Sequence, residues 1–271
     1  MNNNITLESV KLEKEKIEKE NKKVKSLINK LDSNNKELLL LDPLTNFLNQ
    51  KFLHNYTKYL TLTMIEGVLL NEINNINKHT FSLLFCDIDG LKLVNDTMGH
   101  QAGDKGIIAI SEIIHKSIRT NREELMDTFL LNSNIFNNIA IRSGGDEFII
   151  ILPNCTKEMA LVKVVKRIKD NIKNKIDNMS LSIGIVDTNE ITLPKDLSEL
   201  ELIKTFNEIV RIAEKRMYED KNKRMNQKSK TEKEKYVAKE ITRIFNNLGL
   251  DINNENDVTV FYNYLNNLIN K

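Results

Sequence analysis

Alternating apolar and polar runs divide the middle of the chain into short strands and amphipathic helices. Apolar runs of strand length occupy residues 81–86 and 181–186, and the runs 139–141 and 148–152 flank two glycines and predict a hairpin. Helices are predicted at 47–75, 91–97, 105–118, 157–174 and 201–221. The order from residue 81, β-α-α-β-β-α-β-α, indicates an α/β (α+β) domain with a mostly antiparallel central sheet flanked by helices.

The first 41 residues follow a seven-residue repeat. One row of the repeat is wholly apolar and contains Val10, Ile17, Val24, Leu31 and Leu38. The companion row mixes polar and apolar residues and contains Leu7, Lys14, Asn21, Ile28 and Asn35. This pattern predicts that residues 1–41 form a parallel coiled-coil stalk that joins two chains, in which polar positions such as Asn21 favour a defined register. A single helix lying on the next domain is the alternative.

Proline and polar segments mark the boundaries of the domain. Pro43 disfavours helical geometry at Asp42, so the first helix ends there, and Thr45 or Asn46 is a candidate cap for the next helix. The basic stretch 223–235 is predicted to be a linker, followed by two amphipathic helices at 236–248 and 258–269. The chain thus divides into a stalk (1–41), an α/β domain (42–226) and a linker with a helical extension (227–271).

Composition narrows the functional classes. The 271 residues carry a net charge of +2, which gives no reason to expect a nucleic-acid or membrane-surface partner. The two cysteines, Cys86 and Cys155, lack metal-binding or paired spacing, which favours a reducing compartment. No apolar segment is long enough to span a membrane, and the N-terminus has no apolar signal region. We therefore expect a cytoplasmic protein.

The hairpin turn carries the first candidate chemistry. Gly144 and Gly145 predict a turn because glycine accepts positive φ, and a turn without side chains lets a ligand approach the backbone. Asp146 and Glu147 follow at once and are placed to hold a metal ion beside such a ligand. An ordinary acidic turn is the alternative.

A second carboxylate follows a buried strand. Asp87 comes directly after the run 81–86, and burial of a carboxylate is unfavourable unless a partner such as a divalent cation compensates for it. Asp87 as a helix N-cap is the alternative, and Asp89 is equally suited to that role. Asp104 is predicted to cap the helix at 105–118, after a loop in which His100 is a structural residue.

Several ordered motifs between residues 41 and 226 resemble the GGDEF family, the catalytic domains of diguanylate cyclases. They read LDPLTNFLNQKF from Leu41, FCDIDGLKLVNDTMGHQAGD from Phe85, RSGGDEF from Arg142, LSIGIV from Leu181 and AEKRMYEDK from Ala213. The resemblance implies the ferredoxin-type palm of nucleotidyl cyclases. Several motifs in order and at family spacing are far more specific than any one of them alone.

The resemblance also implies an activity. Each of two paired subunits would hold one GTP, and the 3′-hydroxyl of each would attack the α-phosphorus of the other to give cyclic di-GMP and pyrophosphate. Asp87, Asp146 and the carbonyl of Ile88 would hold Mg²⁺, with Mn²⁺ as a substitute. Asp146 would act as the base, Glu147 would support the site, and Lys92 would neutralise charge on the phosphates.

Substrate recognition is implied in the same way. Asn95 and Asp104 would read guanine, since a carboxylate accepts hydrogen bonds from N1–H and the exocyclic amine, which adenine cannot reproduce. Gly144 and Gly145 would leave room for the phosphates, and Lys221 and Arg224 would bind them. The homodimer required for the reaction would be held by the predicted stalk.

The chain departs from the family pattern in three places. The R-x-x-D product-inhibition motif is missing. Counted back from Gly144, its two positions hold Ile135 and Asn138; aligned from the upstream helix, they hold Arg119 and Arg122, so feedback through that site is not expected. Met225 stands where the family has a phosphate-binding arginine, which leaves Arg224, one place earlier, as its substitute. Residues 227–271 have no counterpart in the motif set. A catalytically silent nucleotide-binding module that acts as a signalling scaffold is therefore the alternative function, and a related enzyme with another product is a third.

Overall fold

The computed structural model describes residues 5–28, 40–76, 78–118, 137–247, 254 and 257–262. They belong to two compact units, Met1–Lys221 and Asn222–Lys271. The first unit contains the sheet and every candidate site residue except Arg224.

The described strands form one five-stranded sheet in the order β1-β3-β4-β2-β5. Their bounds are β1 Leu48–Asn49, β2 Ser82–Asp89, β3 Ile139–Arg142, β4 Glu147–Leu152 and β5 Ser180–Asp187. The short strand β1 runs parallel to β3, and the other neighbours are antiparallel. The predicted α+β fold with a mostly antiparallel sheet is therefore confirmed; β1 was not predicted.

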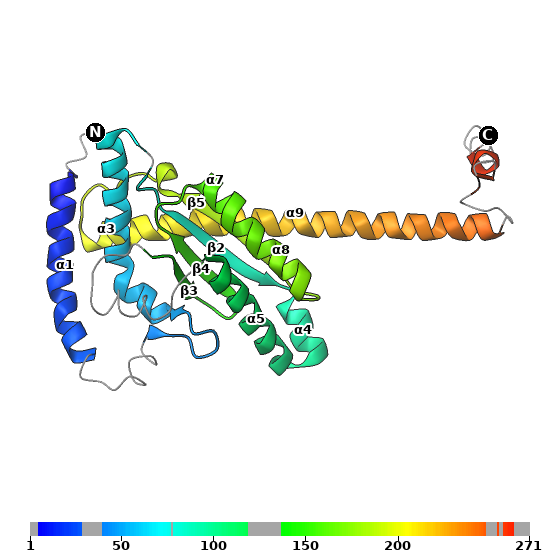
Figure 1. Cartoon of the computed structure of the whole chain (residues 1–271), viewed down its shortest axis with the longest axis horizontal. Helices are drawn as coiled ribbons and strands as arrows, with labels where there is room; N and C mark the ends of the chain where they lie inside the picture. The colour runs from blue at the N-terminus through cyan, green and yellow to red at the C-terminus, as the bar shows by residue number, and fades with distance from the viewer. Residues whose placement is uncertain are drawn as a thin grey trace. The chain divides into compact units, whose positions relative to one another are not determined.

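Helices cover both faces of this sheet (Figure 1). Their bounds are α1 Leu7–Ile28, α3 Gln50–Asn74, α4 Leu91–Met98, α5 His100–Ile118, α7 Lys157–Met159, the π-helical η1 Ala160–Val165, α8 Lys166–Lys175, the 3-10 turn η2 Thr188–Glu190 and α9 Glu199–Asn247. Alternate residues of β2 enter different cores. Leu83 and Phe85 pack on the side of α3 and α9, whereas Leu84 and Cys86 pack on the side of α5 and α8.

The N-terminal helix α1 packs on α3 within a single chain. Val10 is fully buried and Ile17 is 8% exposed, although both belong to the row predicted to face a partner chain. This is the arrangement stated above as the alternative to a stalk. Leu31 and Leu38 lie outside the described residues, and the dimeric stalk stays a prediction.

Two helices begin elsewhere than predicted. α5 begins at His100, so Asp104 lies inside it and is not its cap. Gly99, with φ of 86°, reverses the chain directly after α4 and leaves no loop in which a cap could stand. α3 begins at Gln50 because β1 occupies the preceding residues, and the side chain of Asn49 accepts a hydrogen bond from the N–H of Phe52 as the cap.

The last long helix corrects the predicted linker. α9 runs without interruption through residues 223–235 to Asn247, so this segment is helical. No Gly or Pro interrupts residues 199–247, and their Lys, Glu and Arg side chains favour a helix. Of the last predicted helix, 258–269, only residues 258–262 are described, and they are helical. None of the described helices combines the length and the apolar character needed to cross a membrane.

Candidate functional site

One edge of the sheet gathers the acidic residues that the sequence singled out. Asp87 of β2 lies opposite Glu147 of β4 and Ser182 of β5. Asp146 directly precedes β4, and its carbonyl accepts a hydrogen bond of 3.0 Å from the N–H of Ile88. The strand register therefore places Asp87, Ile88, Asp146 and Glu147 side by side.

Lys221 extends from α9 to this edge. Its Nζ lies 2.5 Å from Oδ1 of Asp87 and 3.8 Å from Oδ1 of Asp89. Burial alone lowers the pKa of Lys221, but the hydrogen bond to Asp87 and the charges of Asp87, Asp89 and Asp146 outweigh burial and raise that pKa. Lys221 therefore keeps a positive charge beside the carboxylates.

Additional positive charge near Asp87 would stabilise its ionised carboxylate. Burial raises the pKa of Asp87, and the charges of Asp146 and Asp89 add to that rise, while the hydrogen bond and charge of Lys221 oppose it. Like charges that share a partly buried site repel one another, and a divalent cation relieves this repulsion. Carboxylate and carbonyl oxygens are also the hard ligands that Mg²⁺ and Mn²⁺ accept.

Asp89 is held in a fixed orientation beside Lys221. Its Oδ1 accepts a hydrogen bond of 2.8 Å from the hydroxyl of Ser182, and its Oδ2 accepts one of 2.9 Å from Ser180. Neither Asp87 nor Asp89 serves as the helix N-cap, because α4 is preceded by Gly90 and has no side-chain cap bond. The cap alternative is therefore wrong for this helix.

The glycine turn is built differently from the prediction. The N–H groups of Ser143 and Gly144 both donate to the carbonyl of Glu147, at 3.0 and 3.4 Å, and neither Gly144 nor Gly145 adopts positive φ. A Cβ on Gly144 would lie 2.9 Å from Oε2 of Glu147, whereas a Cβ on Gly145 would meet no atom within 4 Å. Gly144 thus makes room for Glu147, and Gly145 borders open space.

Glu147 has an acidic neighbour that sequence reasoning missed. Burial raises the pKa of Glu147, and the charges of Asp146, Asp87 and Glu214 raise it further. Glu214 belongs to α9 and lies about two helical turns before Asp220 and Lys221. Its place in the segment AEKRMYEDK was the available signal, but no local pattern connects it to the turn.

The residues expected to read guanine lie on the helix pair α4 and α5. Asn95 is half-buried, and its Oδ1 is buried without a hydrogen-bond partner. A Cβ on Gly103 would lie 1.9 Å from this oxygen, so only glycine at 103 permits the close approach. Asp104 follows Gly103 and is exposed on α5. The helix pair therefore brings Asn95 next to the turn of α5 that carries Asp104.

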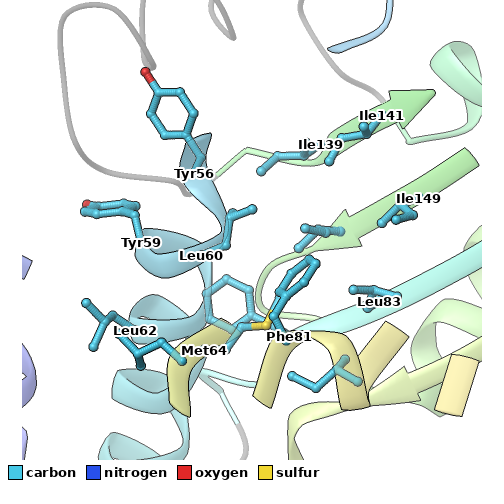
Figure 2. Packing of buried hydrophobic residues seen from close by; sticks show 14 of the residues in the cluster. Tyr56, Tyr59, Leu60, Leu62, Met64, Phe81, Leu83, Ile139, Ile141 and Ile149 are labelled. Carbon is cyan, nitrogen blue, oxygen red and sulfur yellow. The ribbon is translucent and has the colours of Figure 1, made fainter. Parts of the chain in front are cut away.

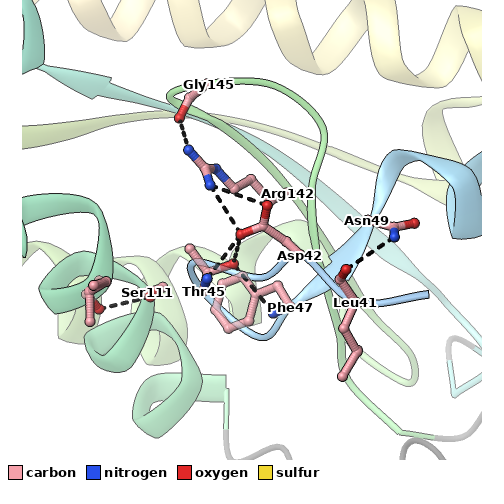
Figure 3. Close-up of polar contacts among 9 residues, drawn as sticks. Leu41, Asp42, Thr45, Phe47, Asn49, Ser111, Arg142 and Gly145 are labelled. Atoms are coloured by element: carbon pink, nitrogen blue, oxygen red, sulfur yellow. Dashed lines mark hydrogen bonds and ion pairs between the residues drawn. The ribbon is translucent and has the colours of Figure 1, made fainter. Parts of the chain in front are cut away.

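Arg142 connects the first motif to the signature turn, a link that sequence reasoning missed. Its guanidinium donates to Oδ1 and Oδ2 of Asp42 at 3.0 and 3.2 Å, and to the carbonyl of Gly145 at 2.7 Å (Figure 3). Thr45 adds hydrogen bonds to Asp42 from its N–H and its hydroxyl. Burial raises the pKa of Asp42, but the bonds from Thr45 and Arg142 outweigh burial and lower it. The turn is therefore tied to residues 100 positions earlier.

The two remaining candidates lie on helix surfaces. Lys92 is exposed near the start of α4. Arg224 is half-buried on α9, three residues after Lys221, whereas Met225 is 63% exposed. Residues three and four apart on a helix both lie near the first one, so the guanidinium, and not the helical position, distinguishes Arg224 from Met225. Among the described residues, no group of three or more His, Cys, Asp or Glu side chains is placed to hold a metal ion. The expected donor set contains two carboxylates and a carbonyl.

Comparison with known families gives one match that covers most of the chain. Residues 39–227 match the family described as diguanylate cyclase, GGDEF domain. Diguanylate cyclase A of Treponema denticola is 32% identical over 195 residues, covering 69% of this chain and 44% of that protein. The probable diguanylate cyclase DgcT of Escherichia coli is 30% identical over 189 residues, covering 66% of this chain and 33% of that protein. The chain thus spans less than half the length of these curated relatives.

Solved structures give similar matches. The coiled coil and GGDEF domain of DgcB from Caulobacter crescentus, in complex with c-di-GMP, is 19% identical with a TM-score of 0.49, covering 76% of this chain and 93% of that one. The GGDEF domain of YfiN from Pseudomonas aeruginosa is 23% identical with a TM-score of 0.48, covering 68% of this chain and 89% of that one.

Proposed function

The chain belongs to the GGDEF family of diguanylate cyclases, and we propose on this basis that it condenses two GTP molecules into cyclic di-GMP. In each half-reaction the 3′-oxygen of one GTP bonds to the α-phosphorus of the other. The bond from that phosphorus to the bridging oxygen breaks, and pyrophosphate leaves. Two such steps close the ring and release two pyrophosphates.

Cyclases of this family generally need a divalent metal ion, and the donor set at the sheet edge fits one. Asp87, Asp146 and the carbonyl of Ile88 would hold Mg²⁺ or Mn²⁺. The ion would polarise the α-phosphate and lower the pKa of the attacking hydroxyl. The support lies in the adjoining, partly buried carboxylates, whose charges repel one another.

The chain's own groups supply the remaining chemistry. Asp146 accepts the proton of the attacking 3′-hydroxyl, and Glu147 borders the base within the same turn. Lys221 is a fixed positive charge at the sheet edge and balances charge that develops on the phosphates, together with Lys92 and Arg224. Gly145 leaves space in which phosphate oxygens can approach the turn.

Guanine selection is assigned to the helix pair α4 and α5. The buried Oδ1 of Asn95 accepts from a base donor, and the exposed carboxylate of Asp104 accepts from N1–H and the exocyclic amine. Adenine offers no donor at N1, so it leaves these acceptors unpaired. Two such sites must face each other, and the residues 1–41 stalk would hold the two chains together as a homodimer.

One observation carries the proposal. The N–H of Ile88 donates to the carbonyl of Asp146 at 3.0 Å, which fixes the end of β2 against the signature turn. The carboxylates of Asp87 and Asp146 therefore share one edge of the sheet.

The proposal is tested by incubating the purified full chain with GTP and MgCl₂ and identifying the products by chromatography. We expect cyclic di-GMP and pyrophosphate, and a loss of at least about 100-fold in rate for Asp146→Ala, because a positioned base contributes on the order of 10²–10⁴. Asp96→Ala is the matched control, since Asp96 is an exposed aspartate of α4 outside the assigned set, and it should keep the wild-type rate. Binding of GTP without any dinucleotide product would instead establish the silent-module alternative.

A further inference from the structure

The apolar seam of α1 is already occupied within one chain. Val10 is fully buried, Ile17 is 8% exposed, and Leu7 packs against the same cluster as a partly buried residue. Leu12, which lies outside the seam, is 56% exposed. Among the side chains of α1 that the structure describes, the apolar residues that would contact a partner helix are therefore packed against the same chain.

The surface that receives α1 is the outer face of α3. Figure 2 shows Tyr59 and Leu62 pointing away from the strands that carry Ile139 and Ile149. Tyr59 is 4% exposed and Leu62 is fully buried. A helix with buried side chains on both faces needs a layer on each side, and α1 supplies the second layer.

Polar contacts fix the position of α1 on this face. Nζ of Lys14 lies 2.7 Å from Oε2 of Glu66, with side-chain exposures of only 15% and 20%. The same ammonium lies 5.1 Å from the centre of the Tyr59 ring, and the Tyr59 hydroxyl donates to Glu18 at 3.2 Å. Lys14 belongs to the second row of the heptad pattern, so both rows face α3.

We infer that the outer face of α3 is a docking surface for α1 of the same chain, and that docking there and pairing in a coiled-coil dimer exclude each other. Val10, Lys14 and Ile17 cannot be buried against α3 and against a second α1 at once. Docking therefore holds chains apart, and release of α1 makes them competent to dimerise. The dimer itself rests on the proposed function, which needs two facing sites.

Glu66 provides a selective test because it lies on α3 and outside the heptad pattern. Glu66→Lys places a positive charge opposite Lys14 and weakens docking without changing the seam. Sedimentation velocity of the full chain without nucleotide should show a dimer dissociation constant lowered by about tenfold, the ratio that corresponds to ~1.4 kcal/mol. Hydrogen exchange at residues 7–17, measured at monomeric dilution, should quicken by a similar factor.

Three further variants complete the test. The charge-swapped pair Lys14→Glu with Glu66→Lys should return both readouts toward wild type, because it restores the ion pair. Glu72→Lys, the same change at an exposed position of α3, should leave both unchanged. If Glu66→Lys fails to fold, Tyr59→Phe keeps the ring, removes the hydroxyl that donates to Glu18, and should shift both readouts in the same direction.

A dimer constant within twofold of wild type, with unchanged exchange in α1, would overturn the inference, as would a chain that never dimerises in any variant. Since these measurements contain no nucleotide, their failure is separate from that of the cyclase proposal, which the product assay decides.

Discussion

At the scale of single residues, each side chain of the candidate site is positioned by its own set of contacts. A Cβ on Gly144 would lie 2.9 Å from the Glu147 carboxylate, whereas Gly145 has open space beside it. Lys221 is kept charged by Asp87, and Asp89 is oriented by two serine hydroxyls. Adjacent glycines in one motif thus have different surroundings, since one lies against a side chain and the other borders open space.

We predict that Gly145→Ala separates folding from activity. Its Cβ would meet no protein atom within 4 Å, so the free energy of unfolding should stay level or rise by ~0.4–1 kcal/mol. If phosphates approach this turn, the methyl group displaces them, and kcat/KM for GTP should fall by about 10- to 100-fold. Denaturant titration and product formation measure the two effects. Full activity in the alanine variant would argue against phosphates at this turn.

At the scale of elements, a polar cluster joins α9 to the end of β5. The guanidinium of Arg216 donates to both oxygens of Glu190 at 3.0 and 2.6 Å, and Lys157 of α7 lies 3.0 Å from the same carboxylate. Glu190 also completes a capping box with Asp187 at the turn η2. Because α9 carries Lys221, this cluster helps to hold the helix that reaches the site.

This cluster predicts a defined pH dependence. Partial burial alone would raise the pKa of Glu190, but the hydrogen bonds from Arg216, Lys157 and Asp187 outweigh burial and lower it to about 2 from 4.5. A carboxyl with a depressed folded-state pKa stabilises the fold above its unfolded pKa, and that contribution disappears as pH falls from 4.5 toward 2. Wild type should therefore exceed Glu190→Gln in urea midpoint near neutral pH, and the gap should narrow below pH ~4. A gap independent of pH would contradict this assignment.

At the scale of the whole molecule, the proposed reaction needs two chains. In that reaction each chain would contribute one set of Asp87, Asp146 and Lys221, and the two reacting GTP molecules would be held by different subunits. The active species is therefore present in proportion to the dimer fraction. On the inference drawn above, docking of α1 on α3 would lower that fraction at a given concentration, and oligomeric state and activity would be coupled through the first helix.

At low protein concentration, the initial rate should consequently rise more steeply than in direct proportion to the concentration of the chain. Below the dimer dissociation constant, each doubling of the chain concentration should raise the initial rate about fourfold, and above it about twofold. Initial rates of cyclic di-GMP formation over a dilution series measure this. A strictly linear series down to the lowest active concentration would contradict a reaction shared between two reversibly associating subunits.

The sequence alone determined the types of the main elements and the positions of the candidate acids, because apolar periodicity and short motifs are local properties. It identified the hairpin with Asp146, the α+β class and the strand that leads to Asp87, although β2 continues through Asp87 to Asp89. It misplaced the start of α5, because a single glycine reverses the chain after α4. The predicted role of Asp104 as the cap of this helix was wrong for the same reason.

Only the tertiary structure decided which distant residues meet. Lys221 pairs with Asp87 across 134 positions, and Arg142 with Asp42 across 100. The seam of α1 is buried on α3 because α3 has two apolar faces, and a heptad pattern does not reveal whether its partner lies in the same chain or in another. The physical reason is the same in each case: burial and charge pairing depend on chain segments that packing brings together, and local sequence does not specify those neighbours.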